Sequence, residues 1–154
     1  KYSLAWSRKY ICHFAAKVGI KIAEFGREIA FTNGARIVFH GGLGLSLAAL
    51  HGNVYLSEYA WANHPYALFQ SALAVSCHSR YRLTLFTSVS PNPEAFAVSK
   101  RSQAKGFSQV HTIEDTAAQG GLWDMQDVEN LKREYTAEEF RQLYLCEWPQ
   151  EVAL

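Results

Sequence analysis

The stretch His51-Gly-Asn-Val-Tyr-Leu-Ser-Glu-Tyr-Ala-Trp61 decides how the rest of the chain is organised. Asn53 to Leu56 is predicted to form a short buried strand, and a helix is predicted to start soon after, at Asn63. Ser57 and Glu58 then stand at the carboxyl end of a strand, where open α/β sheets bind their ligands. Glu58 is therefore a candidate catalytic carboxylate, although a Glu that ends a strand is more often a solvated loop residue.

A second strand is expected at Arg82 to Phe86, and it also ends in polar residues, Thr87-Ser88-Val89-Ser90. Between the two strands, Tyr66 to Cys77 is apolar nearly all round, which is typical of a buried helix. A helix that joins two such strands makes them parallel neighbours with a right-handed crossover. The hydroxyl cluster is therefore expected near Glu58.

Composition limits the class of protein. The 154 residues are 49% hydrophobic and 19% charged, which suits one globular domain over residues 1–154. No apolar run approaches the roughly 20 residues of a membrane span, so no membrane partner is expected. A net charge of +1 gives no overall attraction to nucleic acid. The three cysteines and six histidines show no metal-ligand spacing, so we expect no metal site and a reducing compartment.

The remaining elements are predicted from local patterns. Asn33-Gly34 lies between two apolar runs and predicts a hairpin with a type I′ turn. The glycine-rich stretch 40–52 contains neither GxxxxGK[ST] nor GxGxxG and is interpreted as a flexible connection. Further strands are expected at Tyr2–Trp6 and Phe107–Ile113, and helices after Ser7 up to Gly19, at Leu45–Leu50, at Glu94–Lys100, from Asp124 to Glu134 and after Thr136. This alternation favours an α/β fold with a largely parallel sheet and one β-hairpin.

These residues resemble a known family. Residues 51–61 are similar to the Walker B region in the ATPase part of the terminase large subunit of temperate contractile-tailed phages. The similarity continues at Phe86–Pro91, at Thr112–Thr116, at Arg133–Phe140 and at Leu145–Glu147, and it also includes Asn33-Gly34. It covers essentially the whole chain, and the order and spacing of these segments are more specific than any one of them.

The resemblance implies a P-loop fold of the ASCE or RecA-like type, with three layers and a largely parallel sheet. It also implies a motor that uses ATP and magnesium to package phage DNA into procapsids. The implied partners are double-stranded DNA, the small terminase subunit and the portal, in the bacterial host cytoplasm, and a homo-oligomer is compatible with this. The family's phosphate loop would lie ahead of Lys1, so this chain is expected to lack that unit.

Site residues follow from the same resemblance. Glu58 matches the catalytic Glu, whereas Ser57 stands where the family has a magnesium-side Asp. Thr87 and Ser88 match the motif that couples nucleotide state to DNA movement, although Val89 replaces the expected Pro. Ser57, Thr87 and Ser88 are thus the candidate cofactor-binding residues, and no metal ligand is assigned.

Three readings remain open at this point. The chain can be a truncated, degenerate motor segment without autonomous ATP hydrolysis. It can instead be a non-catalytic module that keeps the fold, binds protein or DNA and uses no cofactor. Accidental similarity of a cytosolic α/β domain is the third. The sequence leaves open whether the chain is an enzyme.

Overall fold

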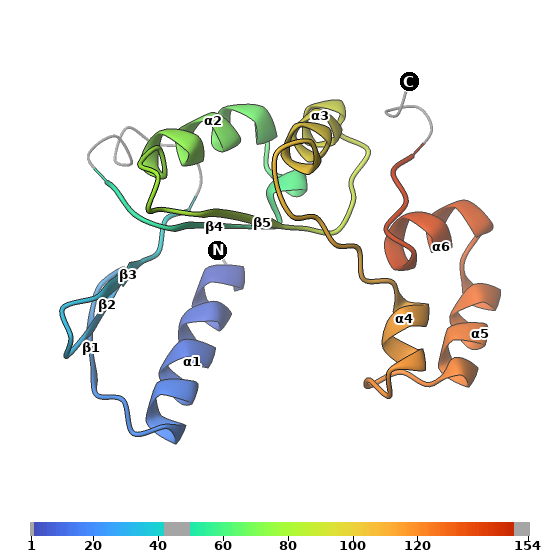
Figure 1. Cartoon of the computed structure of the whole chain (residues 1–154). Helices are drawn as coiled ribbons and strands as arrows, with labels where there is room; N and C mark the ends of the chain where they lie inside the picture. The colour runs from blue at the N-terminus through green and yellow to red at the C-terminus, as the bar shows by residue number, and fades with distance from the viewer. Residues whose placement is uncertain (1, 42–49, 150–154) are drawn as a thin grey trace. The chain divides into compact units, whose positions relative to one another are not determined.

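A computed structural model describes residues 2–41 and 50–149, and the chain divides into two compact units, Lys1–Gly42 and Leu43–Leu154. Each unit is described by itself. The architecture is mixed α/β, with a parallel pair of strands and a separate antiparallel sheet (Figure 1). The single-domain organisation stays a prediction. The helix predicted at Leu45–Leu50 lies almost entirely outside the described residues.

The first unit opens with helix α1, Tyr2–Lys17. The prediction of a strand at Tyr2–Trp6, with a helix that starts only after Ser7, is therefore wrong. The first 18 residues contain neither Gly nor Pro, so nothing interrupts a helix there. A five-residue apolar run is too short for its period to distinguish strand from helix.

Gly19 ends α1 as predicted. Its φ is +72°, a left-handed conformation that glycine adopts without a Cβ penalty. The N–H of Gly19 donates to the carbonyl of Ala16, and the N–H of Ile20 donates to the carbonyl of Ala15. This pair of bonds is a Schellman motif, and it satisfies carbonyls that the helix leaves open.

An antiparallel sheet follows, formed by β1 (Ile22–Phe25), β2 (Glu28–Phe31) and β3 (Arg36–Val38) in that order. The side chain of Arg8 ties α1 to the first hairpin. Its Nε lies 2.8 Å from Glu24 Oε2, and its Nη1 donates to the carbonyl of Gly26. Ile29, which is fully buried, lies at the centre of the sheet.

The hairpin predicted at Asn33-Gly34 is confirmed, but its turn type is not. Phe31 and Ala35 form the closing pair, so the loop has three residues, and the N–H of Gly34 donates to the carbonyl of Phe31. Gly34 has a φ of +84°, whereas Asn33 is not among the described residues with positive φ. A type I′ turn needs positive φ at both positions. Here the left-handed glycine alone closes the loop.

The second unit is built on β4 (Val54–Ser57) and β5 (Leu83–Phe86). They pair in parallel, as predicted, and the register runs from Val54 with Leu83 to Ser57 with Phe86. Helices α2 (Pro65–Val75) and α3 (Pro93–Gln103) lie along one face of this pair (Figure 1). Five buried residues form the core there: Tyr59, Ala60, Phe69, Ala95 and Val98.

The opposite face of the strand pair is open. Tyr55 is 69% exposed and Phe86 is 49% exposed, and the side chains of Ser57 and Thr84 on the same face are exposed too. The side chains of Leu56, Leu83 and Leu85 alternate with these and pack against the core. The strands therefore follow the alternation of a half-buried sheet.

Helix α2 is less buried than its sequence predicts. Pro65, Phe69, Ala72 and Val75 are buried, whereas Leu73 is 38% exposed. A spacing of three to four residues puts the buried positions on one face, so α2 is amphipathic rather than enclosed. The helix predicted to start at Asn63 begins at Pro65 instead, and His64 occupies the N-cap without a side-chain cap bond.

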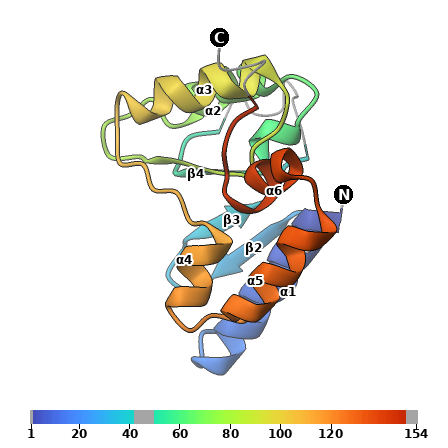
Figure 2. The same ribbon diagram turned by 90° about the vertical axis from the view of Figure 1, so that its right-hand side faces the viewer.

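Three short helices end the described chain: α4 (Ile113–Ala118), α5 (Met125–Glu134) and α6 (Ala137–Tyr144) (Figure 2). The strand predicted at Phe107–Ile113 is wrong. Thr112 and Asp115 instead form a capping box that starts α4, and this local hydrogen bonding competes with an extended chain. Phe107 is 90% exposed.

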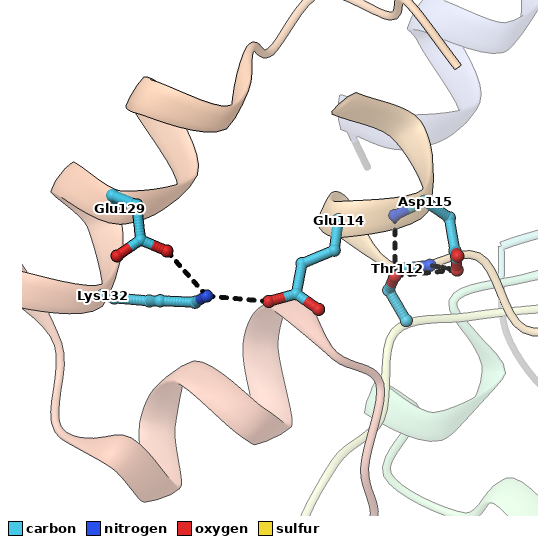
Figure 3. A network of polar contacts seen from close by, with 5 residues as sticks. All are labelled: Thr112, Glu114, Asp115, Glu129 and Lys132. Carbon is cyan, nitrogen blue, oxygen red and sulfur yellow. Dashed lines mark hydrogen bonds and ion pairs between the residues drawn. The ribbon is translucent and has the colours of Figure 1, made fainter. Parts of the chain in front are cut away.

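Polar contacts connect these helices. Lys132 on α5 lies 2.9 Å from Glu114 on α4 and 2.9 Å from Glu129 on its own helix (Figure 3). The helices predicted from Asp124 and Thr136 are confirmed, and both begin with capping boxes. After α6, Trp148 returns to α3, where its ring meets Phe96 with centroids 5.5 Å apart.

Replacing Gly34 should weaken the hairpin. Gly34→Ala places a Cβ at a φ of +84°, which costs about 1 kcal/mol in the left-handed region. We expect faster hydrogen exchange at the amide of Phe31, which closes the loop. Gly52→Ala is the matched control, because a Cβ there meets open space without positive φ. Equal exchange rates in both variants would contradict this account of the turn.

Acid should loosen the C-terminal helices. The hydroxyl and then the backbone N–H of Thr112 lower the pKa of Asp115, and the backbone N–H and then the hydroxyl of Thr136 lower the pKa of Glu139. A pKa lowered by folding gives stability that is present above the ordinary carboxyl pKa and lost as pH falls through the folded value. We expect helicity, measured by circular dichroism, to fall in that acidic window.

The control for this titration is the double variant Asp115→Asn, Glu139→Gln. It should begin with lower helicity and lose less in the same window, because neither capping side chain titrates. Superimposable titration curves for the two proteins would show that the capping boxes do not contribute.

Candidate functional site

The carboxyl ends of β4 and β5 meet at one edge of the parallel pair. Ser57 is in register with Phe86, and the N–H of Glu58 donates to the Phe86 carbonyl at 2.8 Å. The residues that follow each strand, Glu58 on one side and Thr87 with Ser88 on the other, are therefore neighbours. The prediction from the sequence that Glu58 lies close to Thr87 and Ser88 is confirmed.

Glu58 adopts an unusual backbone conformation. Its φ is 53° and its ψ is 40°, in the left-handed region, and it forms the N-cap of the single turn η2, Tyr59–Trp61. For a residue with a side chain this conformation costs about 1 kcal/mol. Strain of this kind persists where surrounding contacts hold it, which is common at functional sites.

The carboxylate of Glu58 is held by the loop after β5. Its Oε2 lies 3.2 Å from Ser88 N, 3.2 Å from Ser88 Oγ and 3.3 Å from Thr87 Oγ1. Thr87 Oγ1 also lies 2.8 Å from the Ser88 carbonyl oxygen, so its one proton is shared between two acceptors. Ser88 thus provides the two clear donors. Oε1 has no hydrogen-bond partner among the described residues, which leaves it able to accept from water.

Ser57 is placed differently from the other candidate residues. Its side chain belongs to the exposed face of the sheet, and no described hydrogen bond links it to the Glu58 carboxylate. A hydroxyl group supplies no charge, so Ser57 cannot replace a metal-binding carboxylate. Among the described residues there is no group of three or more His, Cys, Asp or Glu side chains that could hold a metal ion.

Two further residues of the site were not assigned from the sequence. Ser90, only 1% exposed, donates from its hydroxyl to the carbonyl of Ala60 at 2.7 Å. Trp61 donates from its indole Nε1 to Ser88 Oγ at 2.9 Å. The hydroxyl cluster after β5 was a sequence signal that could have identified Ser90. Trp61 has no comparable signal, because an aromatic residue in an apolar stretch is more often a packing residue.

A shallow hollow in the C-terminal helices is the other candidate. It is lined by residues of α4, α6 and their loops, including His111, Trp123, Tyr144 and Cys146. Cys146 donates from its thiol to the carbonyl of His111 at 3.5 Å, and burial raises the pKa of the thiol. A thiol kept protonated is a poor nucleophile, so this hollow offers no evident chemistry. None of its lining residues belongs to the Glu58 cluster.

Comparison with known proteins gives one family match. Residues 4–151 match the family described as terminase large subunit, T4-like-virus type, N-terminal. The terminase ATPase subunit of Escherichia phage P2 is 27% identical over 176 aligned positions, covering 95% of this chain and 29% of that protein. The probable terminase ATPase subunit of Haemophilus phage HP1 is 26% identical over 170 positions, covering 92% of this chain and 28% of that protein.

The chain thus spans less than a third of the length of these two relatives. No solved structure matches it. In the described part of the chain, no helix has the length and hydropathy needed to cross a membrane.

Removing the Ser90 hydroxyl should destabilise the turn that follows Glu58. Ser90→Ala leaves the buried carbonyl of Ala60 without its donor, which costs about 1–3 kcal/mol. We expect the urea midpoint of the variant to fall accordingly. Ser79→Ala, at an exposed position, is the control and should match the wild type. A Ser90→Ala midpoint equal to that of the control would show that the bond does not hold η2.

Proposed function

This chain belongs to the family of the N-terminal part of terminase large subunits, and we propose that it is a segment of the ATPase part of a phage DNA-packaging motor. The observation that carries the proposal is the position of Glu58. It follows the first of two parallel strands and is bonded to the Thr-Ser pair that follows the second. A motor ATPase requires a carboxylate at such a strand end, near residues that can sense its state.

We infer a three-layer P-loop fold for the parent domain. The parallel pair of β4 and β5 and the helix that joins them support this inference, because such units make up doubly wound sheets. The helices α2 and α3 would form one outer layer. The open face, with Tyr55 and Phe86, is where a second layer would pack.

In this proposal Glu58 orients a water molecule. Its Oε2 is fixed by Ser88, and its Oε1 is free to accept a hydrogen bond from water. Thr87 and Ser88 would then respond to the state of the site because they bond the same carboxylate. Positioning of this kind is a large part of catalysis in phosphoryl transfer.

The residues present do not fit a magnesium site by themselves. Mg²⁺ is usually held by one or two carboxylates together with phosphate oxygens and water. Among the described residues of this site, Glu58 alone supplies a carboxylate, its Oε2 already accepts hydrogen bonds from the Thr87–Ser88 loop, and Ser57 is neutral. The 154 residues also contain no GxxxxGK[ST] element that could cradle phosphates. We therefore propose that this chain alone does not hydrolyse ATP.

The wider role is proposed from the family. The motor would bind ATP and magnesium as a complete protein, in the bacterial host cytoplasm. Its partners would be double-stranded DNA, the small terminase subunit and the portal, and a homo-oligomer would be compatible with this role. A non-catalytic interaction module built on the same fold is the second candidate, favoured by the neutral Ser57.

The 154-residue chain should release no phosphate from ATP above background, with or without magnesium. Loss of one charge-stabilising group costs roughly a hundredfold to a thousandfold in rate, and several are lacking here. Ser57→Asp should not restore turnover, because the phosphate cradle is still lacking. A steady-state phosphate-release assay measures this. Magnesium-dependent turnover that Glu58→Gln abolishes would overturn the proposal that the chain is inactive alone.

A longer protein encoded by the natural gene would distinguish the ATPase motor from the non-catalytic interaction module. If residues ahead of Lys1 carry a Gly-Lys-Ser or Gly-Lys-Thr loop, that protein should hydrolyse ATP. Glu58→Gln should then abolish turnover, whereas Glu138→Gln, on the exposed side of α6, should not. Hydrolysis that is insensitive to Glu58→Gln would refute the role given to Glu58.

A further inference from the structure

We propose that Trp61 is a positioning residue for Glu58 that acts through the hydroxyl group of Ser88. The inference rests on the proposed function for its meaning, since it concerns how the water-orienting carboxylate is held. The contacts themselves are independent of that function. Trp61 Nε1 lies 2.9 Å from Ser88 Oγ, and Ser88 Oγ lies 3.2 Å from Glu58 Oε2.

The chemistry of the three groups sets the direction of the proton on Ser88. An indole N–H can only donate, and an ionised carboxylate can only accept. A serine hydroxyl has one proton and can both accept and donate. With Trp61 occupying an acceptor position, the proton of Ser88 cannot point at the indole and is left for Glu58. Trp61 thereby makes Ser88 a donor to the carboxylate.

The backbone closes this arrangement into a ring. Glu58 leaves β4 in the left-handed conformation, and the N–H of Trp61 donates to the Glu58 carbonyl at 3.1 Å. The single turn η2 therefore carries the indole of Trp61 back to the loop after β5. The ring runs from Glu58 through η2 to Trp61, across to Ser88 and back to the Glu58 carboxylate.

Packing does not explain the position of Trp61. Trp61 is 52% exposed, whereas Tyr59 and Ala60 of the same turn are 4% and 1% exposed and supply the buried contacts. A tryptophan that served mainly as core would be buried. The half-exposed ring with its N–H on Ser88 indicates a role for the hydrogen bond.

The test uses nuclear magnetic resonance on the ¹⁵N-labelled chain without nucleotide. The indole N–H signal of Trp61, one of four tryptophans, is identified by its loss in Trp61→Phe. Ser88→Ala should shift this signal, and Ser88→Thr, which keeps a hydroxyl group, should return it toward the wild-type position. Glu58→Ala should also shift it, because the Ser88 proton then loses its acceptor.

A second measurement tests whether removing the indole of Trp61 changes how Glu58 is held by Ser88. The backbone N–H of Ser88 donates to Glu58, so its signal reports where the carboxylate lies. Trp61→Phe should change this signal and reduce its response to Glu58→Ala. Trp6→Phe is the control, because Trp6 is also 52% exposed but lies on α1 in the other unit.

Two outcomes would overturn the inference. One is that the indole N–H signal of Trp61 shifts in Ser88→Ala but does not shift in Glu58→Ala. The other is a Ser88 amide that responds to Glu58→Ala equally with and without Trp61. If Trp61→Phe does not fold, the indole signal of Trp61 is identified by elimination, from the signals lost in Trp6→Phe, Trp123→Phe and Trp148→Phe. The shifts of that signal in the Ser88 and Glu58 variants then test the inference. The assay requires no ATP, so its result is independent of whether the proposed motor function holds.

Discussion

The parallel pairing of β4 with β5 is the constraint on which the second unit depends. Four-residue strands in this register bring the residues after Ser57 and after Phe86 to one edge. The same register places Leu56 and Leu85 under the helices and leaves Tyr55 and Phe86 outside. A slip of one residue would exchange the two faces and expose the leucines. Core packing therefore determines the register, and the register determines which side chains meet Glu58.

Part of the fold could be predicted from the sequence, because breaker, turn and capping residues mark where helices and strands begin and end. The two parallel strands are apolar runs bounded by polar and turn residues, and α5 and α6 begin at capping residues that their sequences show plainly. The wrong secondary-structure predictions fall where such residues are lacking or are compatible with two structures. Tyr2–Trp6 is a short apolar run like that of a strand, but it continues without a breaker into α1. Phe107–Ile113 alternates like a strand, but the local bonds between Thr112 and Asp115 start a helix instead.

The candidate site was predictable in outline for a similar reason. Polar residues at the ends of neighbouring parallel strands must lie close together, so Glu58, Thr87 and Ser88 could be grouped without coordinates. The hydrogen bonds between these residues could not be predicted from the sequence. Sequence patterns carry no signal for the left-handed conformation of Glu58, which a glycine would adopt more readily. They also do not show which tryptophan uses its N–H within the site, so Trp61 could be distinguished only by its contact with Ser88.

The open face of the parallel pair affects the colloidal behaviour of the chain. Two strands present unpaired outer edges among the described residues, and the face between those edges carries Tyr55 and Phe86. Exposed edges and apolar faces favour strand addition by other molecules. A net charge of +1 provides little repulsion to oppose such contacts. The pairing that assembles the site therefore also limits how concentrated the isolated chain can be kept before it associates with itself.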